Sequence, residues 1–454
     1  MFESVLVANR GEIASRVIHT ARAMGLKAIA VYSQADADLP FVSEADEAVL
    51  IGPADPARSY LNVPAILEAA RRTNAQAVHP GDGYLAENAA FARAVADHGR
   101  VWIGPPPLAI ARMGDKINSR NLVKEAGVPV AAGVWEPVPD VRTAVEEAER
   151  IGYPVMVKPA AGTGGIGMGV AADEETLREA YTAARAGAER LFGPGSTGGD
   201  DVLIERFVPG ARHVEVQILG LADGTVVALG ERECSVQIRH RPIVEEAPSP
   251  CVTPALRERM LAAAVRAGEA VGYRGAGTVE CLVDPGAQEF YFLEMNARLE
   301  AEHAVTESVT GIDLVEQQFR VAAGEPVSFT GTAPRGHAVE FRVRAEDPQR
   351  FLPASGRIEV WEEPVGDGIR IDAGYTEGTT VTPHYDPLLA KLCVHGDDRD
   401  HALRRARAAF EALRIEGPAT NLPFLREILD RPEFADGTYD IGLVARMREG
   451  HADG

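Results

Sequence analysis

The chain has 454 residues, of which 46% are apolar and 25% charged, a balance typical of a soluble globular enzyme too long for one compact core. Its formal net charge of -21 argues against nucleic acid and anionic membrane as partners, because both would repel this surface. Four cysteines without CxxC spacing, no secretory signal and no apolar run of about 20 residues predict a cytoplasmic protein with reduced thiols.

Residues 1–130 alternate short apolar runs with helical spacing, which predicts a Rossmann-like, doubly wound parallel sheet and a helical connector. We expect helices at 13–24, 63–72 and 89–96, two more within 108–130, and strands at 4–8, 27–32, 48–51, 77–78 and 101–103. The loop after the first strand lacks a GxGxxG pattern, so nothing there indicates a dinucleotide site.

Residues 131–204 are expected to form a small lid, with a strand at 154–158 and a helix at 174–188. From residue 202 the pattern changes to long alternating strands, so 205–454 is predicted to be α+β with a largely antiparallel sheet. Its helices are expected at 254–271 and 401–413, and its strands at 202–207, 213–219, 225–229, 278–283, 290–294, 338–344, 357–361 and 388–394.

A glycine-rich turn follows the strand that ends at Lys158, and it includes Gly164, Gly165, Gly167 and then Met168. Glycines allow backbone N–H groups to converge on phosphate oxygens, and Lys158 would add a compact positive charge. A flexible linker is the alternative, although linkers are rarely preceded by a tight apolar strand. The turn therefore predicts a phosphate-binding site.

A second signal is a set of polar residues after the apolar run 290–293. In an extended chain they would share one face: Glu294, Asn296, Arg298, Glu300 and Glu302. The oxygens of Glu294 and Asn296 suit Mg²⁺, and Glu280 on a neighbouring strand would complete the site. A solvated charged face is the alternative, as it is for His213, Glu215 and Gln217 on another strand.

Taken together, these residues resemble biotin carboxylase, an ATP-grasp enzyme, over nearly the whole chain. The ordered matches are 8–14, 79–81, 87–88, 113–116, 212–215, 231–235, 272–278, 294–296, 302–303 and 345–348. The resemblance implies an ATP-grasp fold with an N-terminal pre-ATP-grasp domain (1–130), a lid or B domain (131–204) and a C-terminal ATP-grasp and biotin carboxylase domain (205–454).

The resemblance also implies roles for individual residues. ATP would be held by Lys116, Lys158, Gly164, Gly165, Gly167, Met168, Glu205, His213, Gln237 and His240. Two Mg²⁺ or Mn²⁺ ions would be held by Glu280, Glu294 and Asn296. Glu302 would remove the bicarbonate proton so that the nucleophile attacks the γ-phosphate to form carboxyphosphate. Arg298 would bind that anion, and Arg342 would stabilise deprotonated biotin.

Departures from the family pattern cluster on the bicarbonate and acceptor half of the site. Pro242 stands where the family has Lys, Glu300 where it has Gln, Asp82 where it has an aromatic residue, and Arg344 where it has Asn. Neutral drift is one explanation. The negative charge that Asp82 and Glu300 add is the basis of another hypothesis, a cationic amino or guanidino acceptor.

The favoured function is an ATP-dependent carboxylase that forms carboxyphosphate and carboxylates a nitrogen of biotin or a biotin-like acceptor. The first alternative is a diverged ATP-grasp ligase that joins an activated organic carboxylate to a cationic amine without biotin. The second is a nonenzymatic ATP-binding subunit, against which the retention of Arg298, Glu302 and Arg342 argues. Without a Met-Lys-Met segment, biotin would arrive free or on a separate carrier protein. Family members often dimerise, so a homodimer is also an expectation.

Overall fold

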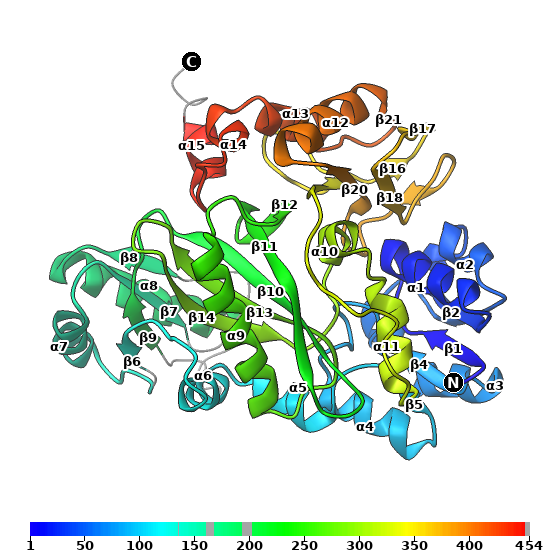
Figure 1. Cartoon of the computed structure of the whole chain (residues 1–454), viewed down its shortest axis with the longest axis horizontal. Helices are drawn as coiled ribbons and strands as arrows, with labels where there is room; N and C mark the ends of the chain where they lie inside the picture. Colours follow the sequence, from blue (N-terminus) through cyan, green and yellow to red (C-terminus); the bar gives the residue numbers. More distant parts are fainter. Residues whose placement is uncertain (135, 160–167, 193–201, 450–454) are drawn as a thin grey trace.

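The computed structural model describes residues 1–134, 136–159, 168–192 and 202–449. In Figure 1 the N-terminal unit (blue) and the small unit (teal) lie at opposite sides of the view, with the green strands between them. The C-terminal helices (orange and red) lie along the top of the same view. Among the described helices, none has both the length and the apolar character needed to cross a bilayer.

The N-terminal unit is the predicted parallel sheet, with strand order β3-β2-β1-β4-β5. Its strands are β1 (Ser4–Val7), β2 (Lys27–Ser33), β3 (Glu47–Gly52), β4 (Ala77–His79) and β5 (Val101–Trp102). Its helices are α1 (Gly11–Ala23), η1 (Gln34–Asp36), α2 (Pro40–Glu44), η2 (Pro56–Arg58), α3 (Val63–Arg72) and α4 (Ala89–Asp97). Val5 and Val7 point into one apolar core and Leu6 into another, because a parallel strand is covered on both faces.

Two connector helices, α5 (Pro107–Gly114) and α6 (Lys116–Glu125), lead into the small unit. That unit contains β6 (Gly133–Val134), α7 (Val141–Ile151), β7 (Val155–Pro159), β8 (Gly169–Ala171), α8 (Glu174–Phe192) and β9 (Val202–Arg206). Its antiparallel sheet has the order β6-β9-β7-β8 and encloses an apolar core of its own.

The grouping of residues 202–207 with the strands that follow them is wrong. The strand β9 pairs with β7 and β6, so it belongs to the sheet of the small unit. Local alternation could not reveal this, because the pairing joins residues more than 40 positions apart, as Lys158 with Leu203. We therefore propose 131–206, rather than 131–204, as the extent of the small unit.

The large C-terminal sheet is antiparallel, as predicted, with the order β14-β13-β10-β11-β12-β15-β20-β18. Its strands are β10 (Arg212–Gly220), β11 (Val226–Ile238), β12 (Arg241–Ala247), β13 (Gly275–Asp284), β14 (Glu289–Asn296), β15 (His337–Arg344), β18 (Ile369–Ala373) and β20 (Leu388–Gly396). The helix α9 (Pro254–Ala270) packs against β10 and β11 and buries Met260, Ala263 and Ala267.

The expected strand 357–361 is divided between two small ribbons outside this sheet. They pair β16 (Gly356–Arg357) with β19 (Thr380–Val381), and β17 (Val360–Glu362) with β21 (Arg414–Glu416). The remaining helices are α10 (His303–Thr310), α11 (Leu314–Ala322), α12 (Arg399–Ala412), α13 (Leu422–Leu429), α14 (Pro432–Ala435) and α15 (Leu443–Glu449).

Candidate active site

A cavity of about 850 Å³ brings most of the predicted site residues together. It lies beside the carboxyl ends of β1 and β4, where the strand order of the parallel sheet reverses and ligands commonly bind in α/β folds. Residues 9–13, which lead into α1, and the loop 82–84 line it together with strands of the large sheet. The predicted residues along its wall are Asp82, His213, His240, Pro242, Glu280, Glu294, Asn296, Arg298, Glu300, Glu302, Arg342 and Arg344.

A row of carboxyl groups crosses adjacent strands on the cavity side of the sheet. The pairing register places Glu215 of β10 opposite Glu280 of β13, and Glu280 opposite Glu294 of β14. Like charges directly opposite one another are unfavourable, and burial together with Glu280 raises the pKa of Glu294. The amide of Asn296 reaches Glu280. Oxygen donors crowded in this way fit a hard divalent cation such as Mg²⁺.

His213 extends this row with a positive charge. Its Nε2 lies 2.8 Å from Glu280 Oε2, and its Nδ1 lies 2.7 Å from Gln237 Nε2. Burial alone would lower the pKa of His213, but the Glu280 carboxylate raises it to about 9. A cationic ring donates from both nitrogens, so Gln237 must then turn its amide oxygen toward the imidazole.

A tight hairpin places His240 at the cavity. The turn between β11 and β12 consists of Arg239 and His240, both with positive φ (51° and 63°). Backbone strain of this kind is concentrated at functional sites. Burial and the nearby charge of His213 lower the pKa of His240, so the ring stays neutral at the wall of the cavity.

Lys158 and Glu205 form an ion pair between β7 and β9 of the small unit. Arg120 of α6 also contacts Glu205, with its Nη2 3.0 Å from Oε2, and this partner was not predicted. Burial lowers the pKa of Lys158 to about 8. Lys116, at the start of α6, lies with its Nζ 3.7 Å from Glu294 Oε2, which connects the helix to the carboxyl row.

Some residues predicted for ATP binding lie away from the cavity wall or beyond the described chain. Met168 is 36% exposed at the start of the segment leading into β8. Gly164, Gly165 and Gly167 lie outside the described residues. Their assignment to phosphate binding stays a prediction.

Glu302 sits directly before α10, with its carboxyl group among arginines. Its Oε2 lies 3.0 Å from Arg342 Nη2, and Arg342 Nε also donates to Glu245 at 2.6 Å. Burial alone would raise the pKa of Glu302, but Arg342, Arg232 and Arg298 lower it to about 2. Glu302 is therefore an ionised carboxylate held by Arg342.

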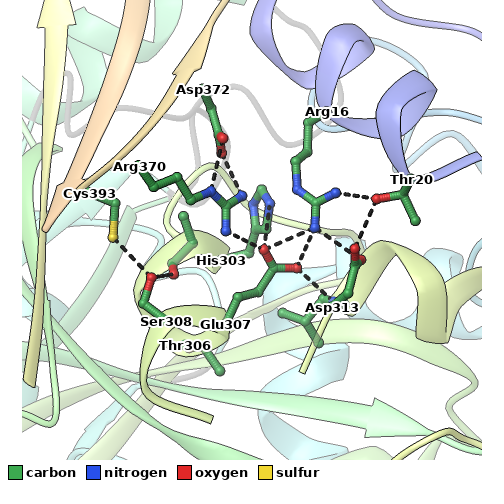
Figure 2. Close-up of polar contacts among 12 residues, drawn as sticks. Arg16, Thr20, His303, Thr306, Glu307, Ser308, Asp313, Arg370, Asp372 and Cys393 are labelled. Carbon is green, nitrogen blue, oxygen red and sulfur yellow. Dashed lines mark hydrogen bonds and ion pairs between the residues drawn. The ribbon is translucent and has the colours of Figure 1, made fainter. Parts of the chain in front are cut away.

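The helix α10, which begins after Glu302, is held in place by the contacts of Glu307 (Figure 2). One oxygen of Glu307 lies 2.9 Å from Arg16 Nη2 of α1, and the other lies 2.6 Å from Arg370 Nη1 of β18. The same residue accepts a hydrogen bond from the backbone N–H of Leu314. This cluster ties α10 to both the N-terminal unit and the large sheet, which fixes the position of Glu302.

Arg298 occupies the cavity between acidic neighbours. Its Nε donates to Glu87 Oε2 at 3.0 Å, and its Nη2 lies 3.3 Å from Glu300 Oε1. Glu87 also accepts from the backbone N–H of Ala297, so it positions the segment as well as the side chain. Glu87 was not predicted as a site residue, although residues 87–88 are among the matches to the family pattern.

The positions that depart from the family pattern have specific surroundings. Pro242 lies in β12, a strand that was not predicted, and Arg344 is held between Glu346 and Asp386 at 2.8 Å from each. Burial raises the pKa of Asp82, and burial with the charge of Glu302 raises that of Glu300 well above its usual value. Both carboxyl groups are thus easier to protonate than usual, which weakens the argument for a cationic acceptor.

Family models match the chain in three consecutive segments. They are the N-terminal domain of biotin carboxylase at residues 1–110, the ATP-binding domain of the carbamoyl-phosphate synthase L chain at 115–330, and the biotin carboxylase C-terminal domain at 340–446. Biotin carboxylase of Halalkalibacterium halodurans is 47% identical over 446 residues, covering 98% of this chain and 97% of its own. Biotin carboxylase 2 of Bacillus subtilis is 46% identical, covering 96% and 98%.

Solved structures give the same result. Biotin carboxylase of Campylobacter jejuni, in a complex described as β-γ-ATP, superimposes with a TM-score of 0.93 at 40% identity, covering 98% of this chain and 99% of its own. The biotin carboxylase domain dimer of Hydrogenobacter thermophilus 2-oxoglutarate carboxylase, with MgADP, ADP and bicarbonate, has a TM-score of 0.92 at 40% identity, covering 98% of both. The chain thus belongs to the biotin carboxylase family and is an ATP-dependent ligase with an ATP-grasp fold.

Proposed function

We propose that the chain uses ATP and bicarbonate to form carboxyphosphate and then carboxylates a nitrogen of biotin. The observation that supports this most directly is the convergence of an ionised base, Glu302, with Arg298 and Arg342 in the cavity that also holds the carboxyl row. Nucleotide binding alone does not require that trio. The relatives reported above carry carboxylase names, and none supports the ligase that joins an acid to a cationic amine.

In this proposal Glu302 removes the proton of bicarbonate while Arg298 binds the oxyanion. A substrate anion beside Arg298 and Arg342 offsets part of their positive charge, which raises the pKa of Glu302 and makes it a better base. Arg342 then faces the deprotonated ureido nitrogen of biotin. Lys116, Lys158 and His213 neutralise phosphate charge, as phosphoryl transfer requires. Mg²⁺ or Mn²⁺ held by Glu280, Glu294 and Asn296 would add charge neutralisation at the phosphates.

We further propose that biotin arrives on a separate carrier protein and that the chain forms a homodimer. The dimer described for the Hydrogenobacter thermophilus domain supports the second part. The four free cysteines are typical of a reducing compartment, which supports our placing of the enzyme in the cytoplasm.

The proposal is tested by measuring ADP release with Mg²⁺, in the presence and absence of bicarbonate. The acceptors added in turn are free biotin, a biotinylated carrier domain and a panel of amines. We expect release to require bicarbonate and to be stimulated by biotin. Release that is stimulated by an amine together with an organic acid, and is indifferent to bicarbonate, would instead support the ligase alternative.

A further inference from the structure

Glu300 is a carboxyl group of the cavity wall with little to neutralise it. Its Oε1 lies 3.3 Å from Arg298 Nη2, but its buried Oε2 has no hydrogen-bond partner among the described residues. Arg232 Nη2 is 3.8 Å from Oε2, beyond hydrogen-bond distance. That guanidinium donates instead to Glu215, Gln217, Thr278 and Thr306.

The acids around Glu300 outnumber the bases. Among the described residues, the glutamates 87, 215, 245, 300 and 302 share the guanidinium groups of Arg232, Arg298 and Arg342. Glu87 is exposed to solvent, but the other four are buried, and four negative charges against three positive leave a net charge of one minus before any substrate anion arrives. Carboxyl groups that crowd one buried site cannot all ionise, so one retains a proton.

The contacts indicate which group keeps the proton. Glu302 and Glu245 each accept a hydrogen bond from Arg342, and Glu215 accepts one from Arg232. Glu300 is the member of this set with a buried oxygen and no guanidinium hydrogen bond. The charged or titratable groups facing it are Arg298 and Glu302 on its own segment, Glu215 of β10, Arg232 of β11, Glu280 of β13, Tyr273 before β13 and His303 of α10.

We propose that Glu300 binds bicarbonate as a neutral carboxylic acid, donating its O–H to the oxyanion that Arg298 holds while ionised Glu302 acts as the base. This inference rests on the proposed function. The proton of Glu300 stays in place: Glu302 takes the substrate proton, a bicarbonate oxygen bonds to the γ-phosphorus, and the bond from that phosphorus to the β,γ-bridging oxygen breaks. Ionised Glu300 would repel bicarbonate, so affinity for this substrate falls at alkaline pH.

Kinetics of Glu300→Gln and Glu300→Ala test the role, because glutamine keeps a donor of similar size that cannot ionise. We expect the KM for bicarbonate of Glu300→Gln to stay within about threefold of the wild-type value at neutral pH. Unlike the wild-type KM, it should not increase at alkaline pH. Glu300→Ala should raise this KM about tenfold or more at neutral pH, as expected for a lost hydrogen bond to a charged group, with the KM for ATP unchanged. Equal losses in both variants, or a wild-type KM as independent of pH as that of Glu300→Gln, would overturn the proposal.

An infrared difference spectrum of wild type minus Glu300→Gln, at neutral pH and without substrates, reads the proton directly. We expect the carbonyl stretch of one un-ionised carboxyl group in the wild type, and its absence would refute the role of Glu300 whatever the kinetics show. A wild type without bicarbonate-dependent ATP cleavage would refute the proposed function and this role with it. An active wild type that lacks the infrared band refutes the role alone.

Discussion

Glu300 and Glu302 lie two residues apart on the wall of the same cavity, yet their surroundings favour opposite protonation states. Arg342 donates to Glu302 and helps to lower its pKa to about 2. One buried oxygen of Glu300 has no hydrogen-bond partner in the described part of the chain, and burial raises the pKa of Glu300 well above the usual value. Position within the charge network, rather than residue type, therefore decides which glutamate is the more readily ionised.

Glu302→Gln should lower bicarbonate-dependent ATP cleavage by about 10²- to 10⁴-fold, the usual contribution of a positioned base. Nucleotide affinity should change little, because Glu302 pairs with Arg342 rather than with the row formed by Glu280 and Glu294. Steady-state ADP release and calorimetry with ATP and Mg²⁺ measure the two quantities separately. Glu258→Gln, on the exposed face of α9, is the matched control. A variant that keeps more than a tenth of wild-type turnover would exclude Glu302 as the base.

Glu294→Gln should weaken the affinity for ATP about tenfold or more when Mg²⁺ is present, because the variant loses an anionic oxygen suited to the metal. The affinity in excess chelator should be nearly the same as that of the wild type. Glu289→Gln, at the exposed start of the same strand, controls for general effects of the substitution. Equal affinities with Mg²⁺ in both variants would remove Glu294 from the metal site.

At the level of elements, alternation of apolar and polar residues located most strands of both large sheets. It missed β18, and it missed β12 because Pro242 argues against a strand. The structure accommodates Pro242 in the second pair from the hairpin turn, opposite Gln237. It also gave one continuous face for Glu294 to Glu302, whereas β14 ends at Asn296 and an irregular segment presents the rest. All five polar side chains still line the cavity. The prediction that they lie on one side is therefore correct, although the prediction of a continuous extended strand is not.

Glu246 of β12 joins elements that are far apart in the chain. It accepts hydrogen bonds from Arg399 of α12 and from the Tyr439 hydroxyl, and its Oε2 lies 2.5 Å from His337 Nε2 of β15. Burial alone would raise the pKa of Glu246, but His337 and Arg399 lower it from 4.5 to about 2. A pKa lowered by folding contributes stability above the unfolded value, and this stability is lost as pH falls toward the folded value.

Glu246→Gln should therefore lower the urea midpoint at pH 7, by an amount equivalent to about 3 kcal/mol for one broken buried pair. The difference from the wild type should shrink as the pH falls from about 4.5 to about 2, because the wild type then loses the same charge. Urea unfolding followed by circular dichroism at several pH values measures this, with the exposed Glu269→Gln on α9 as control. A difference that stays constant with pH would contradict the assignment.

At the scale of the whole molecule, the cavity depends on the close approach of two loops at the carboxyl ends of β1 and β4. Gly81 has φ of +67°, and a Cβ there would lie 2.6–2.8 Å from side-chain atoms of Asn9. Asn9 in turn donates to the carbonyls of Pro80 and Asp82. Only glycine therefore allows these loops to pack together at the cavity.

Gly81→Ala should push the loops apart, at a strain of about 1–3 kcal/mol. A strain of this size corresponds to an increase of about tenfold in the KM for biotin. The affinity for ATP with Mg²⁺ should stay near that of the wild type, because the carboxyl row lies on the other sheet. Gly25→Ala is the matched control, since Gly25 also has positive φ (+77°) but has open space around its Cβ. If Gly81→Ala weakened the affinity for ATP as much as it raised the KM for biotin, the assignment of biotin to the loops and of ATP to the carboxyl row would be contradicted.

Several cavity residues could not be predicted from chemistry in the sequence. Asn9, Arg10, Glu12 and Tyr84 line the cavity from the N-terminal unit, although they lie 200 or more residues from Glu294 in the chain. No local pattern indicates such a convergence, because it depends on how one sheet sits against another. The resemblance marked loop 8–14 as a match and gave it no role.

One apolar core contains residues from both ends of the chain, including Phe2, Val5 and Ile13 together with Phe410 and Met447. Within this core α1 packs against α11, β18 and β20, so during synthesis this side of α1 stays uncovered until β20 has left the ribosome. The small unit has a core of its own and is complete once β9 has emerged. Nascent chains stalled near residue 250 should resist protease in α7, β7 and β9 yet be cut in α1, which makes α1 a segment in need of chaperone protection.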